Sequence, residues 1–554
     1  MHRPALAPCL LATLLAACGS DDPSGVGEGD GTGDSGNVEE SEGGSTPGSA
    51  DGSSGNADES ESGGTPMGDV PARGGITITR VEANPGVAVP IAENGSWVGG
   101  GGRNAPLIKN RNTAFRVYVD VDEASWVPRV IRARLTVTQS DGRETVYEEV
   151  GQIDTDSSPT SLQSNILLGA IADDIQPGAH FQVELFEGGT GWESLPEVDT
   201  PPVALNDGPA EIGIEPSDQF MRMVIVPVDY SFGSCTTSVD LTPEALQPYE
   251  DAMYQQNPLE SIEIEVHAPI SVNDLDLSDG GDFFQLLNRA VQLRASDSPD
   301  PNVYYYVLFD NCGACISESG GCLLGVAPGT PGASEGEASQ RVAIGTRYLS
   351  NDEVGIETFV HEIGHTQGRE HVACPGAQAA GPDITYPYEG GSIGVWGFGV
   401  RDFEIRNPSN HKDYMSYCNP TWVSDWQWSA TFARAKTLSG WQFAVTEPPH
   451  TTMLVGTMNT DTGESHWWTE PGLVTADDER TATSQLAVLG EAGETHVAAA
   501  DVDAWSEGPW VTVRANLPDG ADAMAAAQAF ELRMPGKTTR IARDRVRFDL
   551  VKQR

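Results

Sequence analysis

The segment His361-Glu362-Ile363-Gly364-His365 places two histidines four residues apart, with a glutamate directly after the first. In a helix, residues four apart project from one face, so the two imidazoles can occupy two corners of a zinc tetrahedron. The Glu362 side chain lies beside the face from which the two histidines project, and it leans toward the open side of the metal. There it can hold a zinc-activated water and act as its general base. The segment therefore predicts a metal-dependent hydrolytic centre.

A third histidine follows this helix after a sharp turn. Asn351 or Asp352 can cap the start of the helix, and Gly368 is expected to end it, because glycine tolerates the positive φ of a chain reversal. The reversal brings His371 round as a third ligand. Three histidine ligands leave a fourth position for water, which is typical of a catalytic rather than a structural zinc.

The complete pattern HExxHxxGxxH resembles the zinc signature of the metzincin metallopeptidases. That family also has a Met-turn, a methionine beneath the three histidines, and Asp413-Tyr414-Met415-Ser416-Tyr417-Cys418 follows His371 at a fitting distance. The resemblance implies that Met415 is the Met-turn residue. In astacin- and serralysin-like members a tyrosine two places further on reaches the zinc or the oxyanion, which implies that role for Tyr417. The alternative for Tyr417 is a tyrosine buried in the core.

The resemblance covers roughly residues 221–438. It implies that Arg341–Thr346 is an edge strand that pairs with an extended substrate, which would gain main-chain hydrogen bonds whatever its sequence. It also implies that specificity comes from the pocket wall near Asn419–Trp422. The cysteine-switch propeptide of the matrixins is not evident, so the resemblance does not explain latency.

The composition and patterning divide the chain into five parts. Residues 1–18 read as a lipoprotein signal peptide, and residues 19–73 as a disordered, acidic Gly/Ser linker. Residues 74–215 are expected to form a β-sandwich-like domain, residues 216–438 the zinc metallopeptidase domain, and residues 439–554 a second β-sandwich-like domain. The expected fold class is α+β: a metzincin-like catalytic domain, with a mixed sheet and an active-site helix, flanked by two β-sandwich-like domains.

Hydrophobic periodicity indicates several elements inside these parts. Val130–Val137 alternates between apolar and polar residues, as a half-buried strand does. Tyr304–Phe309 reads as a second strand. Phe283–Leu293 has apolar residues at helical spacing. These elements support a β N-terminal part followed by a mixed α and β part.

The N-terminus carries an export signal. A short basic start precedes an apolar run, and Leu15-Ala16-Ala17-Cys18 resembles the bacterial lipobox, which implies that Cys18 is acylated and becomes the first residue of the mature protein. By resemblance to enterobacterial lipoproteins, Gly19 after this cysteine implies an outer-membrane or cell-surface location. The alternative is ordinary signal cleavage. The linker then acts as a tether that spans roughly 40 Å on average.

Six cysteines remain in the exported part, and all fall in the expected peptidase domain. An even number in an exported chain indicates disulfides. Cys312 and Cys315 form a CxxC pair, whose alternatives are a redox site or half a zinc knuckle. Nearness in sequence supports the pair Cys312–Cys322, and a pair Cys374–Cys418 would brace the site. The six disulfide candidates are Cys235, Cys312, Cys315, Cys322, Cys374 and Cys418.

The charge balance excludes one class of partner. The 554 residues carry a formal net charge of −49, whereas binding nucleic acid requires a basic face. The acidity indicates a solvated surface, with selection of a cationic partner as the alternative. The stretches Asp120-Val121-Asp122-Glu123 and Asn459–Gly463 resemble acidic turns, so a structural calcium ion is a weaker expectation beside the catalytic zinc.

The sequence therefore predicts a surface-tethered zinc endopeptidase that hydrolyses extracellular proteins or glycoproteins. In this hypothesis Glu362 takes a proton from the zinc-activated water and Tyr417 steadies the oxyanion. The alternative is an adhesin or a glycan- or protein-binding lipoprotein in which the β domains have the main role. The intact Glu362 and the three histidines argue against an idle peptidase domain. The membrane is expected as a partner only through the lipid anchor.

The lipid anchor can be tested by replacing its attachment residue. Cys18→Ser is expected to leave the protein exported but released from membranes, because a diacylglycerol together with an amide-linked acyl chain buries enough CH₂ groups for stable anchoring. Fractionation of cells into membrane and soluble parts measures this. A wild-type protein that is wholly soluble would show that the lipoprotein prediction is wrong.

Overall fold

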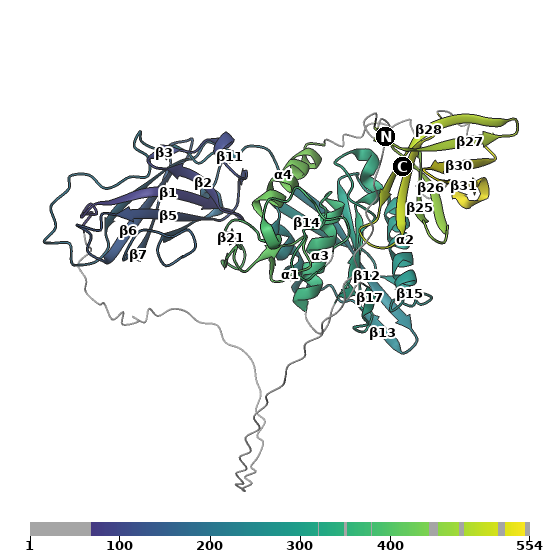
Figure 1. Ribbon diagram of the computed structural model, residues 1–554, viewed down its shortest axis with the longest axis horizontal. Helices are drawn as coiled ribbons and strands as arrows, with labels where there is room; N and C mark the ends of the chain where they lie inside the picture. The colour runs from purple at the N-terminus through teal and green to yellow at the C-terminus, as the bar shows by residue number, and fades with distance from the viewer. Residues whose placement is uncertain are drawn as a thin grey trace, which may run out of the picture. The chain divides into compact units, whose positions relative to one another are not determined.

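The computed structural model describes residues 68–318, 321–347, 352–377, 379–441, 452–475, 481–518 and 527–548 (Figure 1). These residues belong to one compact unit. No helix among them is long and apolar enough to cross a membrane. The signal peptide, Cys18 and nearly all of the linker lie outside the described residues.

The N-terminal part consists mainly of two antiparallel sheets around one core. The five-stranded sheet has the order β3-β2-β1-β5-β8 and the four-stranded sheet the order β10-β9-β6-β7. Their strands are β1 (Ile76–Asn84), β2 (Val89–Glu93), β3 (Ser96–Trp97), β5 (Thr113–Val121), β6 (Arg129–Thr138), β7 (Glu144–Ile153), β8 (Ile166–Ala170), β9 (His180–Glu187) and β10 (Ala210–Glu211). In β6, Ile131, Ala133 and Leu135 are buried and their neighbours are half-buried, as the alternation in the sequence predicted.

The middle part is built on a mostly parallel sheet. Strands β12 (Phe220–Phe232), β16 (Val303–Phe309) and β20 (Val342–Thr346) are parallel neighbours, and β19 (Gly325–Val326) ends the sheet as an antiparallel edge strand. At the other side of the sheet, β12 pairs with β13 (Cys235–Ser238), β14 (Ser261–Val266) and β15 (Ile270–Val272). All seven residues of β16 are buried, as in a parallel strand covered on both faces.

Helices cover both faces of this sheet. Tyr304, Tyr306 and Leu308 of β16 belong to the same core cluster as Phe359 and Ile363 of α3 (Asp352–Thr366). The alternate residues of β16 belong to a second cluster together with the apolar residues of α2. The α-helices among the described residues are α1 (Pro243–Gln256), α2 (Gly280–Asp297), α3 (Asp352–Thr366) and α4 (Asp425–Ser439). The predicted helix over Phe283–Leu293 is confirmed as the central part of α2.

Short pairs of strands and 3₁₀ turns connect these elements. The strand pairs are β4 (Leu107–Ile108) with β11 (Ile214–Glu215), β17 (Ile316–Glu318) with β18 (Gly321–Leu323), β21 (Gly397–Phe398) with β22 (Ile405–Arg406), and β23 (Lys412–Asp413) with β24 (Thr421–Trp422). The 3₁₀ turns are η1 (Gly100–Gly102), η2 (Ala172–Asp174), η3 (Glu335–Gln340), η4 (Glu389–Gly391) and η5 (Arg543–Arg545).

The C-terminal part is a single eight-stranded sheet with the order β31-β30-β27-β28-β29-β25-β26-β32. Its strands are β25 (Thr452–Asn459), β26 (Ser465–Pro471), β27 (Ser484–Gly490), β28 (Gly493–Ala504), β29 (Trp510–Asn516), β30 (Ala529–Met534), β31 (Lys537–Ala542) and β32 (Val546–Arg547). Trp468, Trp505 and Trp510 belong to the core cluster of α2, so the sheet packs on the α2 side of the middle part.

The fold class expected from the sequence, an α+β metzincin-like catalytic domain flanked by two β-sandwich-like domains, is wrong. The described residues are mostly β, with 40% in strands and 18% in helices, and the C-terminal part is one eight-stranded sheet rather than a sandwich. Apolar alternation locates strands but does not determine how many sheets they form, because pairing depends on contacts distant in sequence. The predicted domain boundaries remain predictions.

A buried arginine joins the N-terminal part to helix α1. The Arg111 guanidinium is buried and donates hydrogen bonds to five backbone carbonyls, those of Pro85, Tyr254, Gln255, Asn257 and Leu259, at 2.8–3.2 Å. Three of these carbonyls belong to the last turn of α1 or to its C-cap residue, where the helix dipole favours a cation. Burial lowers the pKa of Arg111 to about 10, so the guanidinium stays charged at neutral pH.

Replacing Arg111 tests this junction. Arg111→Met keeps much of the side-chain volume but leaves five carbonyls without their donor, so it is expected to lower stability by about 3–5 kcal/mol. Arg289→Met serves as the control, because Arg289 forms a surface ion pair with Asp274 whose loss costs about 0–1 kcal/mol. Thermal unfolding of both variants gives the comparison. Equal unfolding temperatures for the two variants would contradict the importance of the junction.

Candidate metal centre

Helix α3 carries His361, Glu362 and His365 into a buried position. Phe359, Val360 and Ile363 of this helix are buried in the same core cluster as residues of the central sheet, which fixes the face that the histidines occupy. All three polar residues are themselves buried, so they lie at the base of a cleft rather than on an open surface.

The chain reverses at Gly368 and brings back His371, as the sequence predicted. Gly368 has a φ of +80°, and a Cβ there would lie 2.8 Å from the carbonyl oxygen of Pro331, so a side chain is excluded on both grounds. The amides of Gly368 and Arg369 donate to the carbonyls of His365 and Gly364 and close the end of the helix.

The three imidazoles converge through their Nε2 atoms. Nε2 of His365 lies 3.1 Å from Nε2 of His361 and 3.1 Å from Nε2 of His371. A tetrahedral ion with nitrogen ligands at 2.0–2.1 Å would hold them about 3.3 Å apart. Within the described chain, these histidines are the one group of three or more His, Cys, Asp or Glu side chains whose ligand atoms come this close. The spacing therefore fits a single metal ion.

Backbone carbonyls determine the tautomer of each imidazole. Nδ1 of His361, His365 and His371 lies 2.8, 2.8 and 2.6 Å from the carbonyl oxygens of Tyr414, Arg369 and Ala380. A carbonyl only accepts, so each Nδ1 carries the proton and each Nε2 presents a lone pair to the centre. Burial lowers the pKa of His361 to about 3 and the pKa values of His365 and His371 below their ordinary range, which keeps the rings neutral as metal ligands must be.

Met415, which the resemblance in the sequence identifies as the methionine of a Met-turn, lies against Gly364 of α3. A Cβ on Gly364 would come within 2.4 Å of the Met415 sulfur, so the glycine between the two helical ligands allows the methionine its place. The turn is held by Asp413, which is buried and accepts hydrogen bonds from the amides of Met415 and Ser424. The Met415 carbonyl accepts from the amide of Val372, directly after the third histidine.

Glu362 faces the cleft with one oxygen unpaired. Its carboxylate packs against the edge strand, where a Cβ on Gly325 would lie 2.7 Å from Oε1. Oε2 is buried and has no hydrogen-bond partner in the part of the chain that the structure describes. Burial, with the negative charge of Glu507, raises the pKa of Glu362 well above its ordinary value. A cation held by the three histidines would oppose this shift.

Tyr417 reaches the same centre, and a residue that the sequence did not indicate joins it. The Tyr417 hydroxyl lies 2.9 Å from Nε2 of His371 and donates a hydrogen bond to the carboxylate of Glu507. Glu507 belongs to the C-terminal part and lies 3.7 Å from Nε2 of His371. Burial and this carboxylate raise the pKa of Tyr417, so the phenol keeps its proton. No local motif marks Glu507, which lies in a loop 90 residues after Tyr417.

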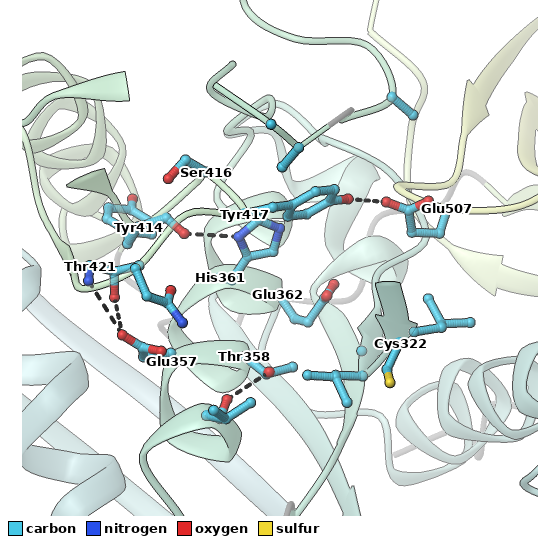
Figure 2. Close-up of a pocket in the computed structure, with 18 residues that line it drawn as sticks. Cys322, Glu357, Thr358, His361, Glu362, Tyr414, Ser416, Tyr417, Thr421 and Glu507 are labelled. Atoms are coloured by element: carbon cyan, nitrogen blue, oxygen red, sulfur yellow. Dashed lines mark hydrogen bonds between the residues drawn. The ribbon is translucent and has the colours of Figure 1, made fainter. Parts of the chain in front are cut away.

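His361, Glu362, Tyr417 and Glu507 line a cavity of about 800 Å³. Figure 2 shows His361, Glu362 and Tyr417 around it, with Glu357 and Thr421 on one side and Glu507 on the other. Asn419 and Thr421 line the cavity, as expected for a wall after the Met-turn. Glu357 accepts hydrogen bonds from the Thr421 amide and hydroxyl.

The expected edge strand requires a correction. Strand β20, which covers most of Arg341–Thr346, is internal to the sheet, because β16 pairs with one side of it and β19 with the other. The edge is β19, and Leu323, Leu324 and Gly325 line the cavity. A strand of two residues has no periodicity to detect, so the sequence did not reveal it.

Three disulfides lie in the middle part: Cys235–Cys312, Cys315–Cys322 and Cys374–Cys418. The pair Cys374–Cys418 connects the loop after His371 to the residue after Tyr417. The expected pair Cys312–Cys322 is wrong, because Cys322 pairs with the nearer Cys315 across the β17–β18 hairpin.

Disulfides indicate an oxidising compartment. A redox CxxC is excluded, since Cys312 and Cys315 have different partners.

Neither acidic turn gains support as a calcium site. In the described chain, Asp120, Asp122 and Glu123 do not form a group of three ligands, and neither do the residues of Asn459–Gly463.

Comparisons with known proteins give little further information. No family model matches the sequence, and no curated protein matches it. Among solved structures, the chain is similar to metalloproteinase-II from Bacteroides fragilis, with 14% identity over 52% of this chain and 78% of that chain and a TM-score of 0.18. A TM-score this low does not show a shared fold or a shared site. The function is therefore inferred from the arrangement of the histidines, Glu362 and Tyr417.

Metal analysis tests the centre directly. Purified protein is expected to contain about one zinc per chain, and His365→Ala is expected to lose most of it, because His365 is the central ligand of the three. His411→Ala is the matched control, since His411 lies outside the triad. Elemental analysis after dialysis measures the metal. Full zinc retention by His365→Ala would mean that the ligands lie elsewhere.

Proposed function

We propose that this protein is an exported zinc-dependent endopeptidase that hydrolyses extracellular proteins or glycoproteins. The observation that carries the proposal is the convergence of three neutral imidazoles, through their Nε2 atoms, beside a buried carboxylate with an unpaired oxygen at the base of a cavity. The ligand set and Met415 support a metzincin-type centre. The intact Glu362 favours a peptidase over an adhesin.

His361, His365 and His371 would hold the zinc ion. When bound, zinc polarises the scissile carbonyl and lowers the pKa of water toward 7. Glu362 then takes a proton from the attacking water and passes it to the leaving amine, for which its unpaired Oε2 is suitably free. The Tyr417 hydroxyl, 2.9 Å from Nε2 of His371, can donate to the oxyanion once it turns from Glu507.

The edge strand supports binding of an extended chain. Because β19 is the last strand of its sheet and its neighbour Leu324 lines the cavity, a substrate backbone laid along it can pair by main-chain hydrogen bonds. Such pairing binds peptides of many sequences, so specificity depends on the side chains around the cavity.

The location is proposed from the three disulfides and the N-terminal signal. The disulfides indicate an oxidising compartment, and a lipid on Cys18 would hold the enzyme at the outer membrane or cell surface on its acidic tether. The substrates are then proteins or glycoproteins outside the cell.

Two substitutions separate catalysis from folding. Glu362→Ala is expected to keep zinc and thermal stability but to lower kcat by about 10²–10⁴, toward the upper end because the base and the proton delivery are lost together. Tyr417→Phe keeps the ring but removes the hydroxyl, so kcat should fall by about 10²–10³ with little change in KM.

Peptide hydrolysis, zinc content and unfolding temperature measured on the same samples give the test. An active Glu362→Ala protein would contradict the mechanism. A fully active Tyr417→Phe protein would show that the Tyr417 hydroxyl has no catalytic role, and since the side chain is 43% exposed the alternative of a tyrosine buried in the core is already wrong.

A further inference from the structure

The C-terminal sheet contributes a residue to the active-site cavity through the loop between β28 and β29. The loop is fixed to the catalytic part beside the edge strand: the Ser506 amide donates to the Ala327 carbonyl at 3.0 Å, and the Ser506 hydroxyl accepts from the Ala327 amide at 3.0 Å. Trp505 stacks on Trp510 and donates through Nε1 to Thr512 at 3.0 Å. Backbone and core contacts therefore determine where the next residue, Glu507, lies.

Gly508 makes this approach possible. It has a φ of +75°, and a Cβ there would lie 2.3 Å from the Phe284 ring of α2. The loop thus turns tightly over α2 immediately after Glu507.

The Glu507 carboxylate reaches the cavity with unused hydrogen-bonding capacity. Its side chain is 21% exposed, and Oε1 accepts from the Tyr417 hydroxyl. In the described part of the chain, no hydrogen bond reaches Oε2 and no Lys or Arg forms an ion pair with Glu507. A carboxylate that is largely removed from water gains most from a charge-assisted partner.

The described residues that line the cavity include no Lys or Arg, whereas Glu357 and Glu362 line it together with Glu507. Three carboxyl groups therefore accompany the two positive charges that a zinc ion held by the histidines would supply. Glu362, with its buried and unpartnered Oε2, aims into the same space. Because Glu362 serves the attacking water in the proposed mechanism, Glu507 is the carboxylate here that could accept from a positively charged group of the substrate.

We propose that Glu507 is a specificity-determining residue that binds a cationic nitrogen of the substrate residue preceding the scissile bond. The proposal rests on the proposed peptidase function. Glu507 accepts from the Tyr417 hydroxyl, which in the proposed mechanism donates to the carbonyl oxygen of the residue before the scissile bond. Glu507 is therefore placed next to that residue, on the opposite side of the cavity from Glu357 and Thr421 (Figure 2).

Two substrate groups offer this chemistry. One is the side chain of Lys or Arg in the residue before the cleaved bond. The other is a free α-ammonium, when that residue is the first of the peptide and the same centre acts as an aminopeptidase, because its nitrogen lies only about 2.5 Å from the reacting carbonyl carbon. A carboxylate this close to the third ligand can reach either nitrogen.

The test compares wild type with Glu507→Gln in the full-length, zinc-loaded protein. Glutamine keeps an oxygen that accepts from Tyr417 but removes the charge. Digestion of a peptide library and sequencing of the new termini should show wild-type cleavage enriched after Lys or Arg, or after a free first residue. In Glu507→Gln, kcat/KM for those peptides should fall about 10–100-fold further than kcat/KM for neutral peptides, mainly through KM, whatever common change in kcat follows from the altered partner of Tyr417. Glu491→Gln, an exposed change outside the cavity, should leave the preference intact.

Acetylation of the peptide N-termini distinguishes the two sources. A preference that survives acetylation comes from a Lys or Arg side chain, and one that disappears comes from the α-ammonium. Either result supports the proposal. An unchanged preference in Glu507→Gln would overturn it, as would an equal loss for cationic and neutral peptides, which would mean that Glu507 only positions Tyr417.

A binding measurement keeps this test separate from catalysis. In a Glu362→Gln background, calorimetric titration with acetyl-Ala-Ala-Lys-Ala-Ala-amide, its Gln analogue and the unacetylated Gln analogue should show tighter binding of at least one charged peptide, lost on adding Glu507→Gln. Absence of cleavage by wild type together with this charge-dependent binding would reject the peptidase function alone. Equal binding of all three peptides would reject the role of Glu507.

Discussion

Three imidazole lone pairs face one another about 3.1 Å apart in a site shielded from water, and the rest of the centre depends on holding them there. The carbonyls that fix their tautomers come from three separate segments: Tyr414 in the Met-turn, Arg369 in the turn after α3, and Ala380 beyond the third histidine. Each segment therefore has to be placed independently before the histidines can share one ion.

The features around the centre hold these three segments in position. The bare backbone of Gly364 lets the Met-turn approach the helix, the reversal at Gly368 fits under Pro331, and Asp413 fastens the Met-turn to the start of α4. The N-terminal β part contributes to this placement through α1. The N-terminal part is tied to α1 by Arg111, and α1 packs on α3 through the contact of Tyr249 with Phe359.

The sequence was informative where chemistry and position are local. His361, Glu362 and His365 follow from helical spacing, His371 from the glycine that ends the helix, and Met415 from a family motif. The fold class was wrong because strand patterns do not specify how strands associate.

The remaining residues of the site depend on long-range contacts. Glu507 comes from a loop between two strands of another sheet, where nothing in the neighbouring residues distinguishes it from an ordinary surface glutamate. The edge strand β19 has only two residues, and its position results from pairing with β20 rather than from its own composition. Cys312 and Cys315 are close in sequence but have different partners because a hairpin places Cys315 beside Cys322.

The disulfide Cys374–Cys418 has a consequence for the order in which the protein matures. It covalently closes the two loops that carry His371 and Tyr417, which are otherwise joined by hydrogen bonds such as the one from Val372 to Met415. In a reducing cytoplasm this link does not form. The third ligand and the hydroxyl beside it are then fastened to each other only after the chain has crossed the membrane. If the protein is exported as proposed, oxidation precedes completion of the centre, and a newly made chain in a reducing compartment lacks this covalent link.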